Sequence, residues 1–596
     1  MVMYNRELRY FWLKLVIAGM ALVFITTLFF IQIVEHDQHV RDANAMRVKQ
    51  YELLAKRGEV YFMDGKENVS PAIMNERTWT IFVDPNFIIK NAGSNGVLSK
   101  EKVQEKLTEI LGDKMITTWD KVWADENNMY VEIAKHVDYS MASKIKESGL
   151  RGVGRKETSR RVYPNGTLGA QLLGFTNAEG VGSGVEGALN DRLAGKNGML
   201  KTVTDVNEIP LSVGDENIEI AAQDGKSIVL TIDENIQRQA EKTLKKVVDS
   251  YKGGIGAASA IIMEPTTGKV WAMANYPTYD PGVYWKEKDA NVYVNRVAET
   301  PYEPASVCKP FTYATAINEG KLNPDETYNN RGYTEVGDRK IYNARDGSGL
   351  QTGVITFREA LTKSFNTGSI EVLRKMGDGT NITKSARVTL YNYLYDKFGL
   401  GHKTGFELYE ASGQIISPED KSGEGNAVRY ANMTFGQGMN LTMLQVAAGF
   451  SSIINGGNYF TPTVIAGEYE NGKLIPAEQK AAVRKTISSG TSAEMRRMLK
   501  DVRSKVGGSK DLPGYRVGVK TGTAETINPK TGAYWSSKTN ASAIGFGGSN
   551  SDDALPSYVI MVRLDGEKLL WGSTDAIPVF TELSNYMLQY LRIEPK

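Results

Sequence analysis

The first strong pattern along the chain is an apolar run near its beginning. Residues 15–34 contain only three polar members, Thr26, Thr27 and Gln32. As a helix rising about 1.5 Å per residue, this run spans a hydrocarbon core of about 30 Å. A cleaved signal peptide is the alternative, but its apolar run would be shorter and would end in small residues rather than Val34. The pattern favours an uncleaved transmembrane anchor.

Charge around this run predicts how the chain crosses the membrane. Basic residues precede the run and acidic residues follow it, namely Arg6, Arg9 and Lys14 against Glu35 and Asp37. An excess of basic residues marks the cytoplasmic side. Residues 1–14 are therefore predicted to be a cytoplasmic tail, and residues 35–596 to lie outside the cytoplasm of a single-pass cell-membrane protein.

Residues 35–223 show short apolar runs separated by turn signals. Polar residues 40–55 are compatible with a helix and indicate a stalk. Apolar runs at 79–83 and 128–133 predict small strands and loops rather than a helical bundle. The segment carries no catalytic constellation, and His136 has no partner motif, so we interpret it as a structural or surface residue. We expect a stalk followed by a non-catalytic, dimerisation-like pedestal.

From residue 224 to residue 596 the pattern is that of a mixed domain. Asp233 offers an N-cap to an amphipathic helix directly after a strand pattern at 227–232. Strands are also predicted at 257–263, 269–274, 516–520, 541–547 and 558–564, with a closing helix at 576–591. The first two of these form a hairpin. The predicted fold class is α+β, with helices packed around a five-stranded, mostly antiparallel sheet.

Composition then removes several classes of function. Lys and Arg number 71 against 69 Asp and Glu, so the net charge of +2 provides no field for nucleic acid, and we expect no nucleic-acid partner. One cysteine, Cys308, cannot form an intrachain disulfide, and no thiol cluster is present to hold a metal. The sequence has only four histidines, so few are available to form a His-based catalytic site. We therefore expect no metal and no cofactor, and a catalytic base other than imidazole.

A first candidate motif joins Ser306 to Lys309. If Ser306 begins a helix, Lys309 lies three residues later on the same face, and its amine can approach the serine oxygen. Pro310 is tolerated only in the first helical turn and so keeps Ser306 near the helix N-terminus, where the macrodipole favours negative charge. Spacing alone is weak evidence, because Ser99 with Lys102 and Ser143 with Lys146 share it in highly charged segments.

Two further motifs follow in the chain. Ser364 and Asn366 end a helical-looking stretch, where the hydroxyl can relay a proton and the amide can orient a lysine and a substrate. Lys520, Thr521, Gly522 and Thr523 follow a predicted strand, where a cation and two hydroxyls can hold a carboxylate and Gly522 permits close backbone approach. The same three letters at 403–405 lie in a loop with no preceding strand, so we interpret them as a decoy.

In this order the three motifs resemble the signature of the penicillin-binding protein family. Segments outside them extend the resemblance to class B, monofunctional members. In the pedestal these are Arg57-Gly58, Asp64-Gly65, Asp84-Pro85, Arg161 to Pro164 and Gly184 to Gly187; in the later domain they are Asn295-Arg296, Tyr302 to Pro304, Gly436 to Gly438 with Thr442 and Gln445, and Pro578 to Phe580. The resemblance covers essentially the full chain and implies a penicillin-binding/serine β-lactamase-like transpeptidase domain on an elongated pedestal.

Five positions depart from the pattern of that family. Phe62 and Met63 replace an Asp-Arg pair, and Ala305 stands where Gly often precedes the serine. Val519 replaces a small residue before the lysine and is expected to narrow the cleft. Cys308 beside the serine is interpreted as a small buried apolar residue without redox chemistry.

The resemblance implies a D,D-transpeptidase that acts on D-Ala-D-Ala ends of peptidoglycan stem peptides and is inhibited by β-lactams. Ser306 would attack, neutral Lys309 would accept the proton, and Ser364 with Asn366 would relay it to the leaving D-Ala. The backbone amides of Ser306 and Thr523 would form the oxyanion hole. Lys520, Thr521 and Thr523 would hold the terminal carboxylate. An exposed lysine is protonated at neutral pH, so Lys309 is predicted to be buried against the second motif.

The resemblance also implies partners and a cellular role. A monofunctional transpeptidase needs nascent strands, so a membrane-embedded glycan polymerase and other wall-synthesis proteins are the expected partners, in contact with the anchor and the pedestal. The stretch at 436–445 and the C-terminal segment are more similar to septal, division-type members than to elongation-type ones.

Three other functions stay open. A non-enzymatic scaffold of a wall-synthesis complex would be expected to lose the motifs, yet all three are intact. A β-lactamase shares the chemistry but is disfavoured by the anchor and the pedestal. A β-lactam receptor is disfavoured because only about fourteen residues are predicted to lie in the cytoplasm.

Overall fold

A computed structural model describes residues 2–36, 38–39, 48–65, 67–177, 179–203, 218–344, 351–419, 425–528, 531–551 and 554–596. Residues 40–47 of the predicted stalk therefore lie outside the described residues. The chain divides into two compact units, one formed by residues 1–58 and 194–226 and the other by residues 59–193 and 227–596.

The first unit begins with the helix α1 (Val2–Phe29), which continues through the π-helical turn η1 (Phe30–Val34). Within it, Leu8–Val34 is long and apolar enough to cross a membrane. This stretch contains the predicted anchor at 15–34 and begins seven residues earlier, because Leu8 to Leu13 are also mostly apolar.

The first unit also contains a small antiparallel sheet with the strand order β1 (Val48–Leu53), β6 (Gly198–Val203), β7 (Ile218–Ile220). The expectation that residues 40–55 are helical is wrong for 48–53. Residues 48–53 pair with 198–203, about 150 positions later, and a local polarity pattern does not report a partner at that distance.

In the second unit one mixed sheet joins the pedestal to the later domain. Its order is β17 (Lys473–Pro476), β16 (Ile465–Glu470), β8 (Ile228–Asp233), β2 (Val60–Asp64), β3 (Asn68–Val83), β4 (Val131–Val137), and β5 (Val153–Val162) also pairs with β3. The strand β8 runs parallel to β2 and antiparallel to β16. Pedestal strands and strands of the later domain therefore share backbone hydrogen bonds.

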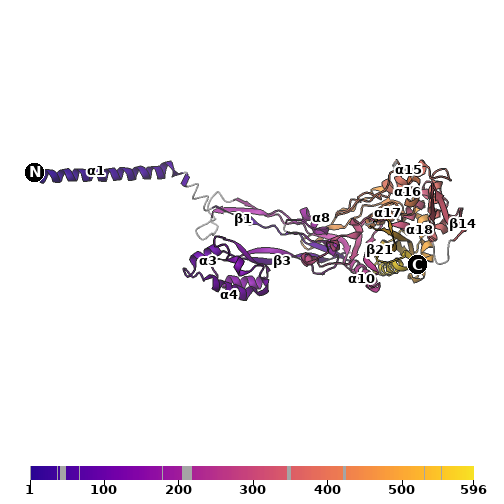
Figure 1. Cartoon of the computed structure of the whole chain (residues 1–596), viewed down its shortest axis with the longest axis horizontal. Coiled ribbons are helices and arrows are strands. Elements are labelled where there is room, and N and C mark those ends of the chain that lie inside the picture. Colours follow the sequence, from indigo (N-terminus) through magenta and orange to yellow (C-terminus); the bar gives the residue numbers. More distant parts are fainter. Residues whose placement is uncertain are drawn as a thin grey trace. The chain divides into compact units, whose positions relative to one another are not determined.

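A lobe of helices gathers at one end of β3 (Figure 1). It consists of α3 (Pro85–Asn91), α4 (Lys100–Leu111), η2 (Gly112–Lys114), α5 (Trp119–Val122) and α6 (Tyr139–Glu147). Val103 and Leu107 of α4 lie in a separate hydrophobic core with Ile81 and Ile133. The predicted short strand at 79–83 is the end of the 16-residue β3, since the polar first half of that strand hides its length from a hydropathy pattern.

The larger core surrounds a five-stranded sheet with the order β10 (Val270–Tyr276), β9 (Ile255–Met263), β21 (Tyr558–Gly566), β20 (Tyr534–Ser549), β19 (Tyr515–Ile527). All four pairings are antiparallel, which confirms the predicted sheet and its first hairpin. The strands β19 and β20 extend well beyond their predicted ends, so β19 carries the third motif within its length rather than after its end.

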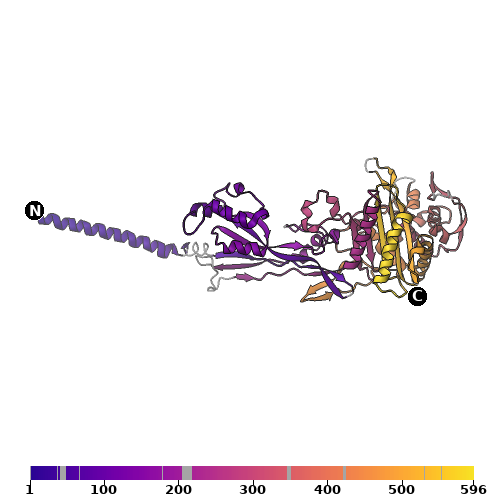
Figure 2. The same cartoon turned by 90° about the horizontal axis from the view of Figure 1, so that it is seen from below.

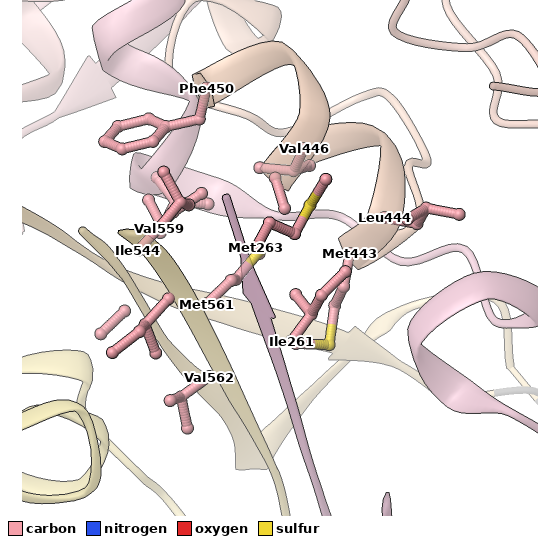
Figure 3. Close-up of a cluster of buried hydrophobic side chains, with 14 of the residues drawn as sticks. Ile261, Met263, Met443, Leu444, Val446, Phe450, Ile544, Val559, Met561 and Val562 are labelled. Carbon is pink, nitrogen blue, oxygen red and sulfur yellow. The ribbon is translucent and has the colours of Figure 1, made fainter. Parts of the chain in front are cut away.

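Helices cover both faces of this sheet. Figure 2 shows α10 (Glu234–Ser250) and α19 (Ile577–Tyr590) side by side over one face. The predicted N-cap of α10 is confirmed, because the Asp233 carboxylate accepts the backbone N–H groups of Asn235 and Ile236 at 2.9 and 3.0 Å. On the opposite face, Met443, Val446 and Phe450 project from α17 (Met443–Ile454) towards β9 and β21 (Figure 3).

The remaining elements surround this core. The helices are α7 (Ala170–Leu173), α8 (Gly184–Ala188), α9 (Asn190–Leu193), η3 (Pro281–Lys286), η4 (Ala290–Tyr293), α11 (Arg296–Glu299), η5 (Ala305–Cys308), α12 (Lys309–Asn318), α13 (Phe357–Thr362), α14 (Asn366–Lys375), α15 (Lys384–Tyr391), η6 (Asn392–Lys397), α16 (Gly425–Met433), α18 (Ser489–Lys505), η7 (Gly508–Lys510) and η8 (Gly572–Ala576). The short strands are β11 (Thr327–Asn330), β12 (Tyr333–Val336), β13 (Arg339–Tyr342), β14 (Gly353–Thr356), β15 (Asn458–Tyr459) and β18 (Arg484–Lys485).

Candidate active site

Ser306 lies in η5, a single 3-10 turn that leads directly into α12. The preceding Ala305 has a left-handed φ of +54°, and its backbone N–H donates to the Gly436 carbonyl at 2.9 Å. Pro310 occupies the first turn of α12, as its fixed φ requires. The half-buried Ser306 lines a cavity of about 650 Å³.

Lys309 has no exposed surface, which confirms its predicted burial. Its amine donates to Asn366 Oδ1 at 2.9 Å, to the Ser364 carbonyl, and to Ser364 Oγ at 3.2 Å. The second motif is therefore the immediate environment of this lysine. Burial, and then the nearby charge of Lys520, hold the pKa of Lys309 well below its usual value.

Ser364 sits at the centre of the three motifs. It has a left-handed φ of +58°, an uncommon conformation for a non-glycine residue, between the end of α13 and the start of α14. Its Oγ lies 3.2 Å from the amine of Lys309 and 2.8 Å from that of Lys520. The hydroxyl thus bridges two amines contributed by distant parts of the chain.

Lys520 is also fully buried, on β19 at the edge of the five-stranded sheet. Burial lowers its pKa to about 7. Thr521, Gly522 and Thr523 line the same cavity as Ser306. A Cβ atom on Gly522 would lie 2.5 Å from Ser542 Oγ and 2.9 Å from the Pro304 carbonyl, so only glycine lets the strand pass this close to the serine turn.

The structure thus brings all eight predicted site residues to one cavity or its wall, from three separate segments. The two buried amines have no carboxylate partner among the hydrogen bonds and ion pairs of the described residues. Two such cations repel each other at low dielectric, which favours the neutral form of at least one amine.

A buried amide network behind the second motif escaped the sequence analysis. Asn343 Oδ1 accepts the backbone N–H of Thr367 at 3.0 Å, and Asn343 Nδ2 donates to Asn330 Oδ1 at 3.0 Å. Next to it, Asn366 Nδ2 donates to the Tyr342 carbonyl at 3.0 Å, which turns Asn366 Oδ1 towards Lys309. No local signal identifies Asn330 and Asn343, because their importance comes from burial and from partners 13 to 24 positions away.

Other wall residues were also missed: Phe435, Gln437, Trp571, Ser573 and Thr574. Gln437 belongs to the segment noted at 436–438, whereas Trp571 to Thr574 carried no recognised signal.

The expectation that Val519 narrows the cleft is wrong. Val519 is fully buried in the hydrophobic core and is not among the residues that line the cavity. Cys308 is buried and apolar in its surroundings, and burial raises the pKa of its thiol.

The decoys lie elsewhere. Lys102 is exposed on α4 and Lys146 is exposed on α6. Thr404 lies in a loop, where its backbone N–H and hydroxyl donate to the Glu410 carboxylate at 2.9 and 2.8 Å. The same Ser-x-x-Lys spacing therefore occurs on two exposed helix faces and at one buried site, and of these three copies only that at 306–309 has its lysine buried.

Pedestal motifs form a structural cluster of their own. The guanidinium of Arg161 pairs with the fully buried carboxylate of Glu186 and donates to Asn75 Oδ1 at 2.8 Å. Phe62, one of the departures from the family pattern, is fully buried in the main core. His136 is exposed beside Thr78, and desolvation of its ring, followed by the nearby charge of Arg160, lowers its pKa.

Comparison with known proteins identifies the family. Residues 258–585 match the penicillin-binding protein transpeptidase domain, and residues 19–230 match the penicillin-binding protein dimerisation domain. The chain belongs to the penicillin-binding protein family. The two domains together confirm the predicted class B architecture, with an α+β transpeptidase fold behind a dimerisation domain.

Relatives of this class B penicillin-binding protein cover most of its length. Stage V sporulation protein D of Bacillus subtilis is 30% identical over 560 residues, covering 91% of this chain and 79% of that protein. Peptidoglycan D,D-transpeptidase FtsI of Escherichia coli is 25% identical over 571 residues, covering 95% and 89%. The crystal structure of penicillin-binding protein 2X from Streptococcus thermophilus superposes with a TM-score of 0.69 at 25% identity, covering 91% and 80%.

Proposed function

We propose that this chain is a peptidoglycan D,D-transpeptidase that crosslinks stem peptides through a serine acyl-enzyme and is inhibited by β-lactams. The observation that carries the proposal is the burial of Lys309 against Ser364 and Asn366, with Lys520 on the other side of the Ser364 hydroxyl. A buried amine without a carboxylate partner is a base at neutral pH.

The hydrogen bonds of Lys309 indicate where it accepts a proton. A neutral amine has two N–H donors and one lone pair. The Ser364 carbonyl and Asn366 Oδ1 accept the two N–H donors, so the lone pair is left for a hydroxyl proton. Ser306 Oγ then bonds to the penultimate carbonyl carbon of a D-Ala-D-Ala end, while its proton passes to Lys309.

The remaining groups complete the acyl transfer. The backbone amides of Ser306 and Thr523 are assigned to the oxyanion, where one donor typically contributes about 10²- to 10³-fold in rate. Lys520, Thr521 and Thr523 hold the terminal carboxylate. As the C–N bond breaks, the proton moves through Ser364 Oγ to the departing D-Ala amine. An acceptor amine then bonds to the acyl carbon, the ester bond to Ser306 breaks, and the acceptor's proton returns to Ser306.

Cellular placement belongs to the same proposal. The apolar helix anchors the chain in the cell membrane with residues 1–14 in the cytoplasm and the transpeptidase domain outside. The role is septal wall synthesis, supported by the similarity to FtsI. A membrane-embedded glycan polymerase supplies the strands and contacts the anchor and the pedestal.

Intact-protein mass after incubation with benzylpenicillin tests this function. A stable adduct on the wild-type chain that is lost in Ser306→Ala is the expected result. Absence of an adduct on the wild type would favour a scaffold, and rapid hydrolysis of a chromogenic β-lactam would favour a β-lactamase.

A further inference from the structure

A short turn after β21 lies against the third motif. Its Trp571 backbone N–H donates to Asp575 Oδ2 at 2.6 Å, and the Thr574 hydroxyl donates to the same oxygen at 3.0 Å. The Asp575 N–H donates back to the Trp571 carbonyl at 2.9 Å. On its other side, Asp575 Oδ1 accepts the hydroxyl of Tyr251, which follows the last residue of α10. The carboxylate of Asp575 therefore closes the turn and fastens it to α10.

Gly572 is the point at which this turn touches β19. Its backbone N–H donates to Thr523 Oγ1 at 3.1 Å. A Cβ atom at position 572 would lie 2.4 Å from the Gly522 carbonyl, 2.8 Å from the Ser542 carbonyl and 3.0 Å from the Gly522 nitrogen. The turn reaches the strand only because residue 572 is glycine, and only while the turn keeps its shape.

The direction of this hydrogen bond has a chemical consequence for Thr523. A hydroxyl has one proton and two lone pairs. Because the Gly572 N–H occupies one lone pair, the proton of Thr523 is directed away from Gly572. Thr523 lines the cavity that also contains Ser306, so the cavity is the side on which a hydrogen-bond acceptor can meet this proton.

We propose that Asp575 is a positioning residue for the carboxylate of the substrate. With Tyr251 it holds the Gly572 N–H against Thr523, so that the Thr523 hydroxyl is presented as a donor. This selects ligands that bear a free carboxylate beside the reacting carbonyl. The inference rests on the proposed function, in which Thr523 contacts that carboxylate.

The experiment compares benzylpenicillin with its methyl ester on the full-length chain. Stopped-flow acylation separates the dissociation constant of the first complex from the acylation rate constant. In Asp575→Ala we expect the dissociation constant for benzylpenicillin to rise about 3- to 10-fold, the loss of one hydrogen bond to a charged group. The acylation rate constant and the affinity for the ester are expected to change less than about 2-fold.

Two further variants separate positioning from a folding defect. Asp575→Asn keeps one acceptor oxygen and is expected to recover most of the affinity. Tyr251→Phe removes only the hydroxyl and is expected to weaken benzylpenicillin about 2-fold, again without effect on the ester. The matched control is Glu567→Ala, which removes a more exposed carboxylate paired with Lys538 a few residues before the turn.

A double variant tests whether Asp575 acts through Thr523. Thr523→Val alone is expected to weaken benzylpenicillin, and adding Asp575→Ala is expected to weaken it no further. Equal losses for the acid and the ester, or additive losses in the double variant, overturn the positioning role. Wild-type protein that forms no adduct with either compound overturns the proposed function itself, and this inference with it.

Discussion

The pedestal and the candidate active site both bury cationic side chains, but they differ in whether a carboxylate is paired with the cation. In the pedestal, Arg161 is paired with the fully buried carboxylate of Glu186. In the active site, Lys309 and Lys520 are buried with a hydroxyl between them, and no ion pair to either is found among the described residues. The first arrangement joins β5 to α8 through an ion pair. The second lowers the pKa of both lysines, which costs stability and produces a base.

The largest effect is expected from Lys309→Met, which removes the base and keeps the volume. We expect the rate constant for acylation by a fluorescent penicillin to fall about 10²- to 10⁴-fold. The thermal midpoint is expected to change little, because removing a buried amine offsets the loss of its hydrogen bonds to the Ser364 carbonyl and Asn366 Oδ1. Lys102→Met, in a decoy motif, is the matched control and is expected to change neither quantity. A Lys309→Met protein that acylates at the wild-type rate would exclude this lysine as the base.

Arg161→Met is expected to show the reverse pattern. It removes the guanidinium that pairs with the buried carboxylate of Glu186, and breaking such a pair costs about 3 to 5 kcal/mol of folding free energy. Urea denaturation, monitored by hydrogen exchange of the β5 backbone amides, measures this loss of folding free energy. The acylation rate constant at low temperature is expected to stay near the wild-type value. Arg160→Met is the control, since its pair with Glu76 is about half exposed and is expected to contribute less than about 1 kcal/mol. Equal losses in the two variants would remove the distinction between the two regions.

Asn343→Ala tests whether the active site depends on its buried amide layer. The variant removes the side-chain oxygen that accepts the buried Thr367 N–H, a cost of about 1 to 3 kcal/mol. Since Asn366 is adjacent, the rate constant for acylation is expected to fall about 10-fold in penicillin-binding kinetics. The exposed Asn329 on β11 provides the control variant Asn329→Ala, for which we expect no change. A wild-type rate in Asn343→Ala would show that α14 holds Asn366 without help.

The smallest expected effect is a shift in the pH profile of the acylation rate constant, on its acidic side. Acylation needs neutral Lys309, so the rate falls as pH drops through the pKa of this lysine. The charge of Lys520 lowers that pKa, and Lys520→Met removes the charge. The pKa of Lys309 then rises, and the acid limb moves to higher pH in a pH profile of acylation by the methyl ester, which lacks the carboxylate that Lys520 would bind. An unmoved limb would show that burial alone sets the pKa of Lys309.

Much of this molecule was accessible from local patterns. The hairpin of β9 and β10, the N-cap at Asp233, the closing helix and the five strands of the main sheet all follow from residue periodicity over ten or so positions. The predictions failed where a residue's structure depends on a strand partner that lies far away in the sequence. The strand β1 pairs with residues about 150 positions later, and Val519 faces the core instead of the cleft because the sheet assigns its side.

What the sequence by itself determined was the identity and order of the reactive groups, the anchor, and the need for a base other than histidine. Only the tertiary structure decided which lysine is deprived of water, how Ser364 joins amines supplied from 55 and 156 positions away, and that Gly572 directs the Thr523 proton. The physical reason is that helix and strand periods are properties of neighbouring residues. Burial, pKa and hydrogen-bond direction are set by atoms that meet only when the chain has folded.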